Sequence, residues 1–422
     1  MKEKFNSIKK YNFWNKTSPN LGYLRTEYTD KIIKYTENRL IKVLVGQRRS
    51  GKSYILRQLI NKLIGEGVNR ENILYINKEY TEFDFITNYS DLDSFVKYYQ
   101  KTLAVSGKIY LFIDEIQDIA DWERFVNSYS QNFVEEYEVF ITGSNSNMLS
   151  GELSTLLSGR YVEFEIFPFS YNEYLKFLEK ENNKQNFIEY MESGGLPELF
   201  NLQNDEIKRN YVSAVKDSVF FRDIIQRYSI KEPKLLEDVF IYLVNNAANL
   251  ISISNIVNYF KNLGRKTTYD TISAYISYME NSFLIHKSER YNIKGKDTIS
   301  GNAKYYINDL AFKNYLYKGY AYGIGYKIEN IVYLNLRRAG YKVYTGVFGN
   351  REIDFVALKD DKHLYLQVSY LMLDKSTFER EYSALELIPD NFEKIVLSLD
   401  DVQFPQRNGI KHSQIWKFDF NK

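Results

Sequence analysis

The sequence predicts an α/β protein whose first part is a parallel sheet covered by helices. Five short apolar runs begin near residues 41, 73, 109, 138 and 161, and segments with helical periodicity separate them. The first run breaks into a glycine-containing loop, and the third ends in two acidic residues. Buried strands that alternate with helices are typical of a parallel sheet, which binds ligands at the carboxyl ends of its strands.

Length and composition limit the classes of protein that fit. A chain of 422 residues has room for roughly two to four domains. The formal net charge is only +2, so any nucleic acid would have to bind a local basic patch. The chain lacks cysteine, which excludes disulfides and zinc–thiolate sites. No apolar run approaches the ~18 residues of a membrane span, and the N-terminus lacks the apolar core of a signal peptide, so we expect a cytoplasmic protein.

The first apolar run leads into a phosphate-binding loop, GQRRSGKS, with the spacing G-x-x-x-x-G-K-[ST]. Gly46 and Gly51 permit the tight turn and the close approach of backbone N–H groups to a triphosphate. A helix that begins near Lys52 directs its positive end at the anion. We expect Lys52 to reach the β- and γ-phosphates of ATP and the Ser53 hydroxyl to bind Mg²⁺.

The other residues of the loop complete the predicted ATP contact. They are Gln47, Arg48, Arg49, Ser50 and Tyr54. Arg48 and Arg49 contact phosphate in one interpretation and form an exposed, solvated pair in the other.

The third apolar run, IYLFIDE at 109–115, predicts the second half of the site. Asp114 emerges at the carboxyl end of a buried strand, where it can bind Mg²⁺ directly or through water. Glu115 follows as the group that polarises the attacking water. The two motifs together predict ATP hydrolysis.

Two later positions could complete catalysis. Asn145, with Ser144 as the alternative, follows the strand at 139–142 and could orient the same water; either residue could instead cap the next helix. Arg160 precedes the strand at 161–166. It could act as an arginine finger toward a neighbouring subunit of a homo-oligomer, act within its own chain, or be an ordinary surface arginine.

Helical patterns follow the predicted sheet. The segment 168–232, which includes one long predicted helix over 205–228, suits a helical lid over the nucleotide. The segment 233–315 has three helical patterns and then two strands, which is the order of a winged helix. Its third helix starts beside basic residues, and basic residues also lie on the wing: Arg265, Lys266, Lys294 and Lys296. They could contact DNA phosphates, but a structural, protein-binding winged helix is the alternative.

The segment 316–422 has the element order of a metal-dependent nuclease core. Glu329 lies on a predicted helix, Asp354 on a strand, and Gln367 and Ser369 on the next strand. Such a site needs acids to bind Mg²⁺ and a lysine to activate water. Here Gln367 replaces an acid and Ser369 replaces the lysine. We therefore expect a degenerate site that has lost cleavage, with a working nuclease as the alternative.

An ordered set of motifs carries a family resemblance. The set is GQRRSGKS at 46–53, FIDEIQ at 112–117, ITGSNS at 141–146, SGRY at 158–161, GGLPE at 194–198 and REIDFV at 351–356. With it the chain resembles AAA+ superfamily ATPases of the AAA_14 type that carry a C-terminal DUF4143 domain. The resemblance implies an AAA-type ATPase core, a helical and winged-helix middle and a restriction-endonuclease-like tail. It assigns Lys52, Ser53, Asp114 and Glu115 to the ATP site and Asp354 to the tail motif.

These observations predict four domains and one overall activity. The domains are a P-loop ATPase core with an N-terminal extension at 1–167, a lid at 168–232, a winged helix at 233–315 and an endonuclease-like α/β domain at 316–422. We expect ATP hydrolysis with Mg²⁺ to drive conformational work on a macromolecular partner. DNA is the favoured partner; an ATP-regulated nuclease and a switch that acts on protein are the alternatives.

Overall fold

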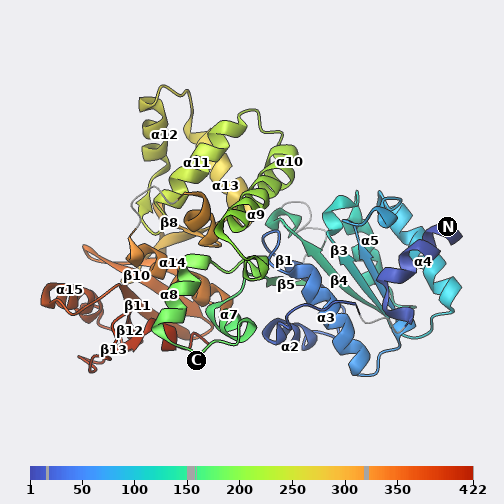
Figure 1. Cartoon of the computed structure of the whole chain (residues 1–422), viewed down its shortest axis with the longest axis horizontal. Coiled ribbons are helices and arrows are strands. Elements are labelled where there is room, and N and C mark those ends of the chain that lie inside the picture. Colours follow the sequence, from blue (N-terminus) through green and yellow to red (C-terminus); the bar gives the residue numbers. More distant parts are fainter. Residues whose placement is uncertain (16–18, 150–156, 158, 318–322, 422) are drawn as a thin grey trace. The chain divides into compact units, whose positions relative to one another are not determined.

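The computed structural model describes the chain except residues 16–18, 150–156, 158, 318–322 and 422. Ser158, the first residue of the SGRY motif, therefore lies outside the described residues. The chain divides into two units, Met1–Ile166 and Phe167–Lys422 (Figure 1). The helices of the described ranges include none that is long and apolar enough to span a bilayer.

A five-stranded parallel sheet forms the centre of the first unit. Its strands are β1 (Ile41–Val45), β2 (Ile73–Asn77), β3 (Ile109–Asp114), β4 (Tyr137–Gly143) and β5 (Tyr161–Glu165). The strand order is β2-β3-β4-β1-β5, and every neighbouring pair is parallel. The predicted α/β class and its five-stranded sheet are thus confirmed. The order also places β4 between the two strands that carry the nucleotide motifs.

Helices cover both faces of this sheet (Figure 1). Helices α2 (Thr26–Ile33) and α3 (Lys52–Gly65) lie on one face, and α4 (Tyr89–Leu103) and α5 (Trp122–Ser130) lie on the other. Since strand side chains alternate between the two faces, every second side chain of a strand lies on the face that α3 covers. Phe112 and Phe140 belong to this set and stack with ring centroids 4.4 Å apart. The sequence had left the N-terminal helix α1 (Lys2–Ile8) unpredicted.

An eight-stranded mixed sheet runs through the second unit. Its strands are β6 (Leu250–Ile251), β7 (Ile285–Asn292), β8 (Asp297–Ile307), β9 (Lys342–Phe348), β10 (Arg351–Lys359), β11 (Lys362–Ser369), β12 (Glu393–Ser398) and β13 (Lys411–Gln414). The strand order is β13-β12-β11-β10-β9-β7-β8-β6. The parallel pair β7–β9, with Arg290 opposite Thr345, joins strands from the segments 233–315 and 316–422. The two predicted domains therefore share one sheet.

The second unit contains the predicted helices and one more, at Lys375–Glu386. They are α7 (Tyr171–Phe177), α8 (Lys184–Ser193), α9 (Asp205–Ser218), α10 (Gln226–Tyr228), α11 (Pro233–Asn245), α12 (Ile253–Asn262), α13 (Tyr269–Asn281), α14 (Ile324–Arg338) and α15 (Lys375–Glu386). A π-helical stretch, Val219–Ile225, joins α9 to α10. The predicted long helix over 205–228 is thus continuous, but its middle is wound more widely than an α-helix. The predicted lid role of this segment stays a prediction.

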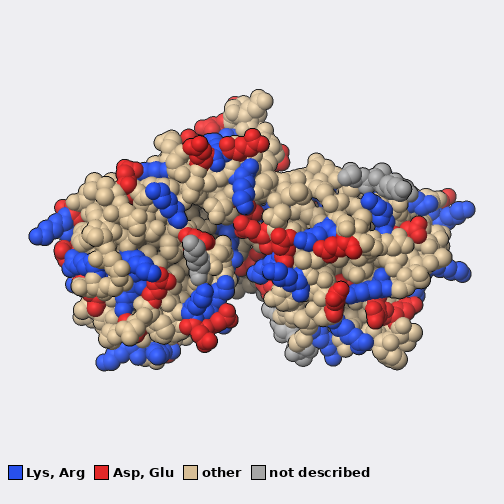
Figure 2. All heavy atoms as spheres, turned by 90° about the horizontal axis from the view of Figure 1, so that it is seen from below, with Lys and Arg blue, Asp and Glu red and all other residues tan. Residues whose placement is uncertain are grey.

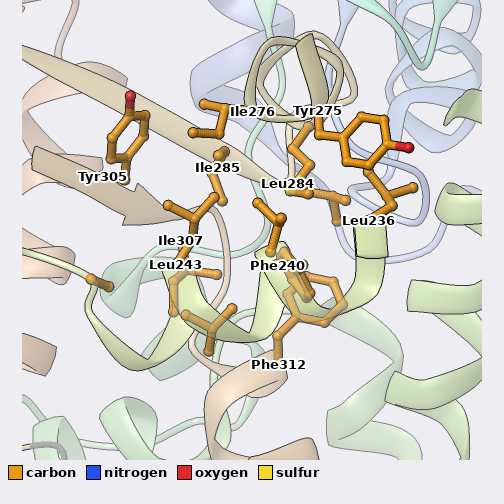
Figure 3. Close-up of a cluster of buried hydrophobic side chains, with 14 of the residues drawn as sticks. Leu236, Phe240, Leu243, Tyr275, Ile276, Leu284, Ile285, Tyr305, Ile307 and Phe312 are labelled. Carbon is orange, nitrogen blue, oxygen red and sulfur yellow. The ribbon is translucent and has the colours of Figure 1, made fainter. Parts of the chain in front are cut away.

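Helices α11 and α13 pack on the hairpin of β7 and β8 (Figure 3). Phe240 of α11 and Ile276 of α13 meet Leu284, Ile285 and Ile307, and all five side chains are buried. The 3.6-residue repeat of the helices and the alternation of the strands direct these side chains to one core. That core holds the two helices against the hairpin.

A buried carboxylate explains the Gly194-Gly195 pair. Asp309 accepts hydrogen bonds from the backbone N–H groups of Gly195, at 2.9 Å, and Ala311, at 2.8 Å. A Cβ on Gly194 would lie 2.2 Å from an Asp309 carboxylate oxygen, so glycine is required there. Burial raises the pKa of Asp309 to about 6. The sequence had given this motif only as part of the family resemblance.

We predict that Gly194→Ala destabilises the second unit by about 3 kcal/mol, because it adds a steric clash to backbone strain. Urea unfolding measures the loss. Gly264→Ala is the matched control, since Gly264 has φ +76° against +77° for Gly194 but no atom near its missing Cβ. We expect the control to cost about 1 kcal/mol. Equal losses in the two variants would contradict the role of Asp309.

Candidate functional site

The loop after β1 has the backbone conformation that its glycines predict. Gly46 has φ +146° and Gly51 has φ +100°, and a Cβ on Gly46 would lie 2.3 Å from the Ile166 carbonyl oxygen. Lys52 begins α3 and is 4% exposed. Its Nζ donates to the carbonyl oxygens of Gly46, at 2.8 Å, and Gln47, at 3.1 Å. The ammonium group is therefore held across its own loop, where an anion would replace the two carbonyls as its partner.

The residues between and after these glycines have different surroundings. Gln47 and Ser50 are fully buried. Arg48 is half-buried with its guanidinium 3.3 Å from Glu79, and Arg49 is exposed, so the two arginines do not form an exposed pair. Tyr54 lies on α3 with the Arg57 guanidinium 4.2 Å from its ring centroid.

Asp114 is fully buried at the carboxyl end of β3. Its carboxylate accepts hydrogen bonds from the hydroxyls of Thr142 and Tyr75 (2.9 Å) and from the Asn77 amide (3.1 Å). Burial, reinforced by the charge of Glu115, raises the pKa of Asp114, while hydrogen bonds from Thr142 and Ser53 lower it. The predicted metal ligands Ser53 and Asp114 therefore meet.

Sequence reasoning missed Tyr75, Asn77 and Thr142. These residues come from β2 and β4, which flank β3 in the sheet. Since the carboxyl ends of parallel strands meet at one edge, the polar residues at the ends of these runs were the available signal.

Glu115 follows Asp114 with a left-handed backbone, φ +55°. Its N–H donates to the Thr142 hydroxyl at 2.9 Å, and its carboxylate accepts a hydrogen bond from Gln117. A second carboxylate oxygen lies 3.9 Å from Lys52 Nζ. The structure thus brings Lys52, Asp114 and Glu115 to one site. The left-handed turn at Glu115 holds its carboxylate beside the Lys52 ammonium group.

Asn145 and Ser144 follow β4 and are both fully buried. Because β4 lies between β1 and β3, both residues are at the same sheet edge as the phosphate loop. Which of them orients a water stays a prediction.

Arg160 lies at the amino ends of the strands of this sheet, opposite the end that carries the phosphate loop. It precedes β5, its carbonyl accepts from the Ile41 N–H, and its guanidinium donates to Asn127 at 2.6 Å. The phosphate loop follows the opposite end of β1, and five strand residues span about 16 Å. The interpretation of Arg160 as a finger within its own chain is therefore wrong, because the strand separates the two.

The N-terminal extension supplies a contact that sequence reasoning also missed. Arg25 is 3% exposed, and its Nη1 donates to the Ser50 carbonyl oxygen at 2.8 Å. Gln58 of α3 accepts from the Arg25 N–H and donates to the carbonyls of Leu21 and Tyr23. The segment before α2 is thus fastened to the phosphate loop and its helix.

A second polar cluster lies in the other unit. Lys304 of β8, which is 4% exposed at its side chain, places its ammonium 2.9 Å from Glu329, 2.8 Å from Glu352 and 3.6 Å from Asp354. Tyr306 also donates to Glu329, at 2.7 Å. Burial alone would lower the pKa of Lys304, but the charges of the three acids outweigh it and raise that pKa. Burial and the charge of Glu329 raise the pKa of Asp354 to about 8.

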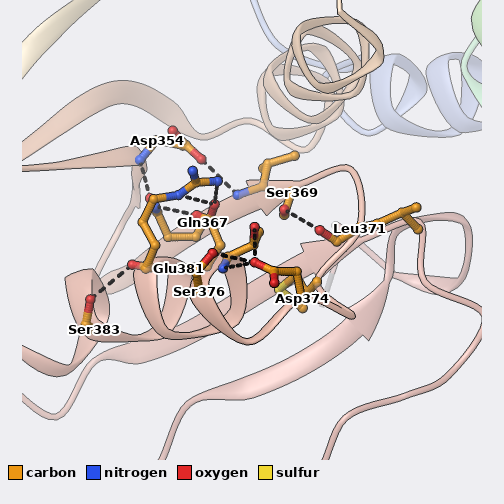
Figure 4. A network of polar contacts seen from close by, with 12 residues as sticks. Asp354, Gln367, Ser369, Leu371, Asp374, Ser376, Glu381 and Ser383 are labelled. Atoms are coloured by element: carbon orange, nitrogen blue, oxygen red, sulfur yellow. Dashed lines mark hydrogen bonds and ion pairs between the residues drawn. The ribbon is translucent and has the colours of Figure 1, made fainter.

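The remaining predicted residues of this cluster are hydrogen-bonded to one another or to nearby backbone (Figure 4). Gln367 accepts from the Asp354 N–H at 2.7 Å and donates to Glu381 at 3.0 Å. The Ser369 hydroxyl donates to the Leu371 carbonyl at 3.4 Å. These residues line a cavity of about 640 Å³. Gln367 thus connects Asp354 to Glu381 of α15 and does not replace an acid in a cation site.

The cluster corrects one expectation about the lysine. Ser369 stands at the position where the nuclease pattern has a lysine. Lys304 nevertheless brings an ammonium group to the acids from a strand that is distant in the sequence. Within the described ranges no group of three acidic or histidine side chains is arranged to hold a metal ion. Lys304 therefore supplies the positive charge among these acids.

Comparison with known protein families agrees with the first site. Residues 38–175 match the AAA_14 family, described as an AAA domain. Residues 184–321 match DUF8612, a domain of unknown function, and so the DUF4143 type is not the one that matches.

Two relatives extend over most of the chain. An uncharacterized protein of Haemophilus influenzae is 35% identical over 391 residues, which covers 92% of this chain and 96% of the relative. An uncharacterized protein of Methanocaldococcus jannaschii is 33% identical over 395 residues, which covers 88% of this chain and 85% of the relative. Among solved structures, the Walker-type ATPase of Pyrococcus abyssi is 17% identical with a TM-score of 0.48, and the match covers 70% of this chain and 96% of that one.

We predict that Lys304→Met destabilises the protein by about 3 to 5 kcal/mol near pH 8, because it leaves buried carboxylates without a cation. Their folded pKa values, already raised, rise further. A raised folded pKa gives stability that is present below the unfolded value and lost as pH rises. The deficit should therefore shrink toward pH 5 in urea unfolding.

Lys411→Met is the matched control for this prediction. Lys411 is on β13 of the same sheet, and its exposed side chain pairs with Glu393 at 2.8 Å. An exposed pair contributes little, so this variant should unfold like the unaltered protein at both pH values. A Lys304→Met deficit independent of pH would contradict the charge argument.

Proposed function

The chain belongs to the same family as the Haemophilus influenzae and Methanocaldococcus jannaschii proteins and carries an AAA domain. We propose that it binds and hydrolyses ATP with Mg²⁺. The observation that carries the proposal is the 3.9 Å approach of Lys52 Nζ, in the phosphate loop, to the Glu115 carboxylate that follows β3. It joins the triphosphate-binding loop to the acids of the neighbouring motif. Ser53 and Asp114, which interact at the same end of the sheet, complete the set.

The side chains present fit a magnesium ion. Hard oxygen ligands suit Mg²⁺, and both the Ser53 hydroxyl and the Asp114 carboxylate are of this kind. Thr142, Tyr75 and Asn77 hold Asp114 in one orientation, so it needs little rearrangement to bind a cation. The bound ion would neutralise charge on the phosphate oxygens.

The chain's own residues have distinct roles in the proposed reaction. Lys52 exchanges its two carbonyl partners for phosphate oxygens, and the loop N–H groups with the start of α3 bind the rest of the anion. Glu115 accepts the proton of the attacking water, and Gln117 orients its carboxylate. Asn145, buried at the same edge, orients that water.

The proposal includes a macromolecular partner and a cytoplasmic location. We infer that hydrolysis drives domain movement on DNA, with the segment 168–232 as a lid and 233–315 as a winged helix. Three helices followed by a hairpin support the winged helix. Lys304 among the C-terminal acids argues against the nuclease alternative, because it supplies the charge that a catalytic cation would bring. A protein partner remains the other candidate.

We predict that Lys52→Ala loses ATP binding, because the loop then lacks its only ammonium group near the phosphates. Glu115→Gln should keep ATP binding and lose turnover by about 100-fold or more, because the amide cannot accept a proton. Isothermal titration with ATP and a phosphate-release assay separate the two effects. Lys62→Ala is the control, because Lys62 lies on the exposed side of α3. This variant should bind and hydrolyse ATP like the unaltered protein. Full hydrolysis by Glu115→Gln would refute the assignment of the base.

Arg160 gives a second prediction, which concerns oligomers. If it reaches the γ-phosphate of a neighbouring subunit, Arg160→Ala alone and Lys52→Ala alone should both be inactive. A mixture of the two should recover part of the hydrolysis, because some interfaces then combine an intact loop with an intact arginine. Inactive mixtures, measured over a range of protein concentrations, would exclude a shared site.

A further inference from the structure

The N-terminal segment, residues 2–15, lies along the outer side of β2. Because β2 is the edge strand of its sheet, the backbone groups on that side have no neighbouring strand to bond. Two side chains of the segment take the place of a strand. Asn12 accepts a hydrogen bond from the Tyr75 N–H at 2.8 Å and donates one to the Tyr75 carbonyl oxygen at 3.1 Å. Trp14 donates to the Ile73 carbonyl oxygen at 2.7 Å.

Asn12 fixes the backbone of Tyr75 more closely than covering an edge requires. Asn12 is 2% exposed, and its amide nitrogen also donates to the carbonyl oxygen of Ile8, the last residue of α1, at 3.3 Å. The amide is therefore anchored to α1 while it bonds both polar backbone groups of Tyr75. The other side of β2 pairs with β3, so Tyr75 is held between the segment and the rest of the sheet.

The side chain of Tyr75 reaches the acid of the ATP site. Tyr75 is 2% exposed and packs on the face of the sheet that α3 covers. Its hydroxyl donates to an Asp114 carboxylate oxygen at 2.9 Å, and Asn77 donates to the same oxygen at 3.1 Å. Because the aromatic ring is rigid and enclosed, the position of the hydroxyl follows that of the Tyr75 backbone. A shift of Tyr75 at Asn12 would therefore move a donor of Asp114.

Long-range charge does not replace this local arrangement on the face that Figure 2 shows. There Lys and Arg mix with Asp and Glu, so the face lacks a broad field of one sign that would concentrate a cation. The whole chain has a formal net charge of only +2. The affinity of an oxygen site for Mg²⁺ then depends on how firmly its few ligands are held.

We propose that Asn12 is a positioning residue for Mg²⁺: through Tyr75, it holds the Asp114 carboxylate in the orientation that binds the ion. The inference rests on the magnesium site of the proposed function. It adds to that site a residue from outside the AAA domain, whose match begins at residue 38. Groups that orient a metal ligand typically change metal affinity by about 10- to 100-fold.

The first test compares Mg²⁺ binding in two variants of the full-length protein. Asn12→Ala removes the hold on the Tyr75 backbone, and Tyr75→Phe removes a donor to Asp114. Each should raise the Mg²⁺ concentration that half-saturates the ADP complex by about tenfold, measured by isothermal titration, while ADP affinity in EDTA stays unchanged. An unchanged Mg²⁺ requirement in Asn12→Ala would overturn the proposal. So would equal weakening of ADP binding with and without Mg²⁺, which a purely structural role predicts.

The double variant tests whether Asn12 acts through Tyr75. Both changes break one connection, so Asn12→Ala with Tyr75→Phe should raise the Mg²⁺ requirement by about tenfold, no more than either change alone. A rise of about a hundredfold, the product of two independent effects, would overturn the route through Tyr75. Asn12→Ser, whose side chain is too short to bond both backbone groups of Tyr75, replaces Asn12→Ala if that variant does not fold, and the same rise is expected.

Trp14→Phe is the matched control. It removes the hydrogen bond between the segment and the Ile73 carbonyl but keeps an aromatic ring. Ile73 begins β2, and Asn77 at its other end is about 13 Å away along the strand. The Mg²⁺ requirement of this variant should therefore equal that of the unaltered protein. A rise as large as that of Asn12→Ala would overturn the proposal, because general loosening of the segment would then be enough.

Mg²⁺ binding by the unaltered protein separates this inference from the proposed function. If Mg²⁺ strengthens ADP binding in the unaltered protein but Asn12→Ala has the same Mg²⁺ requirement, only the role of Asn12 fails and the ATP site stands. If Mg²⁺ has no effect on nucleotide binding by the unaltered protein, the magnesium site fails and the role of Asn12 fails with it.

Discussion

Burying a carboxylate is the constraint around which both units are organised. A carboxylate removed from water must be given donors or a cation, or it becomes protonated. Asp114 receives hydroxyl and amide donors from two neighbouring strands. Asp309 receives two backbone N–H groups, and Glu329 and Asp354 receive the ammonium of Lys304. Each solution fixes elements that are far apart in sequence, and the first of them holds Asp114 beside the phosphate loop.

The first site was predictable because its signal is local. The phosphate loop is a fixed spacing within eight residues, and Asp114 and Glu115 follow directly on one apolar run. Strand ends at one edge of a parallel sheet meet by rule, so the meeting of Ser53 and Asp114 could be expected. The partners of Asp114 obey the same rule, but choosing Tyr75 and Asn77 among other polar residues requires the strand order.

The second cluster could not be predicted in the same way. Lys304 and Asp354 are 50 positions apart, and they meet because β8 and β10 belong to one sheet with β7 and β9 between them. No local pattern encodes the parallel pairing of β7 with β9. A search for lysine at position 369 therefore found serine, while the ammonium came from another strand. The within-chain interpretation of Arg160 failed for a related reason: the direction of β5 decides at which end of the strands Arg160 lies.

The pairing of β7 with β9 bears on how this chain can be divided. A cut between the segments 233–315 and 316–422 would separate two strands in the middle of an eight-stranded sheet and expose a long unpaired edge on each piece. It would also strip Glu329, Glu352 and Asp354 of their lysine. The two segments therefore complete one sheet together: a gene fusion or exchange that moved one without the other would leave an unpaired strand edge on each half. What resembles two modules in sequence is a single sheet in the structure.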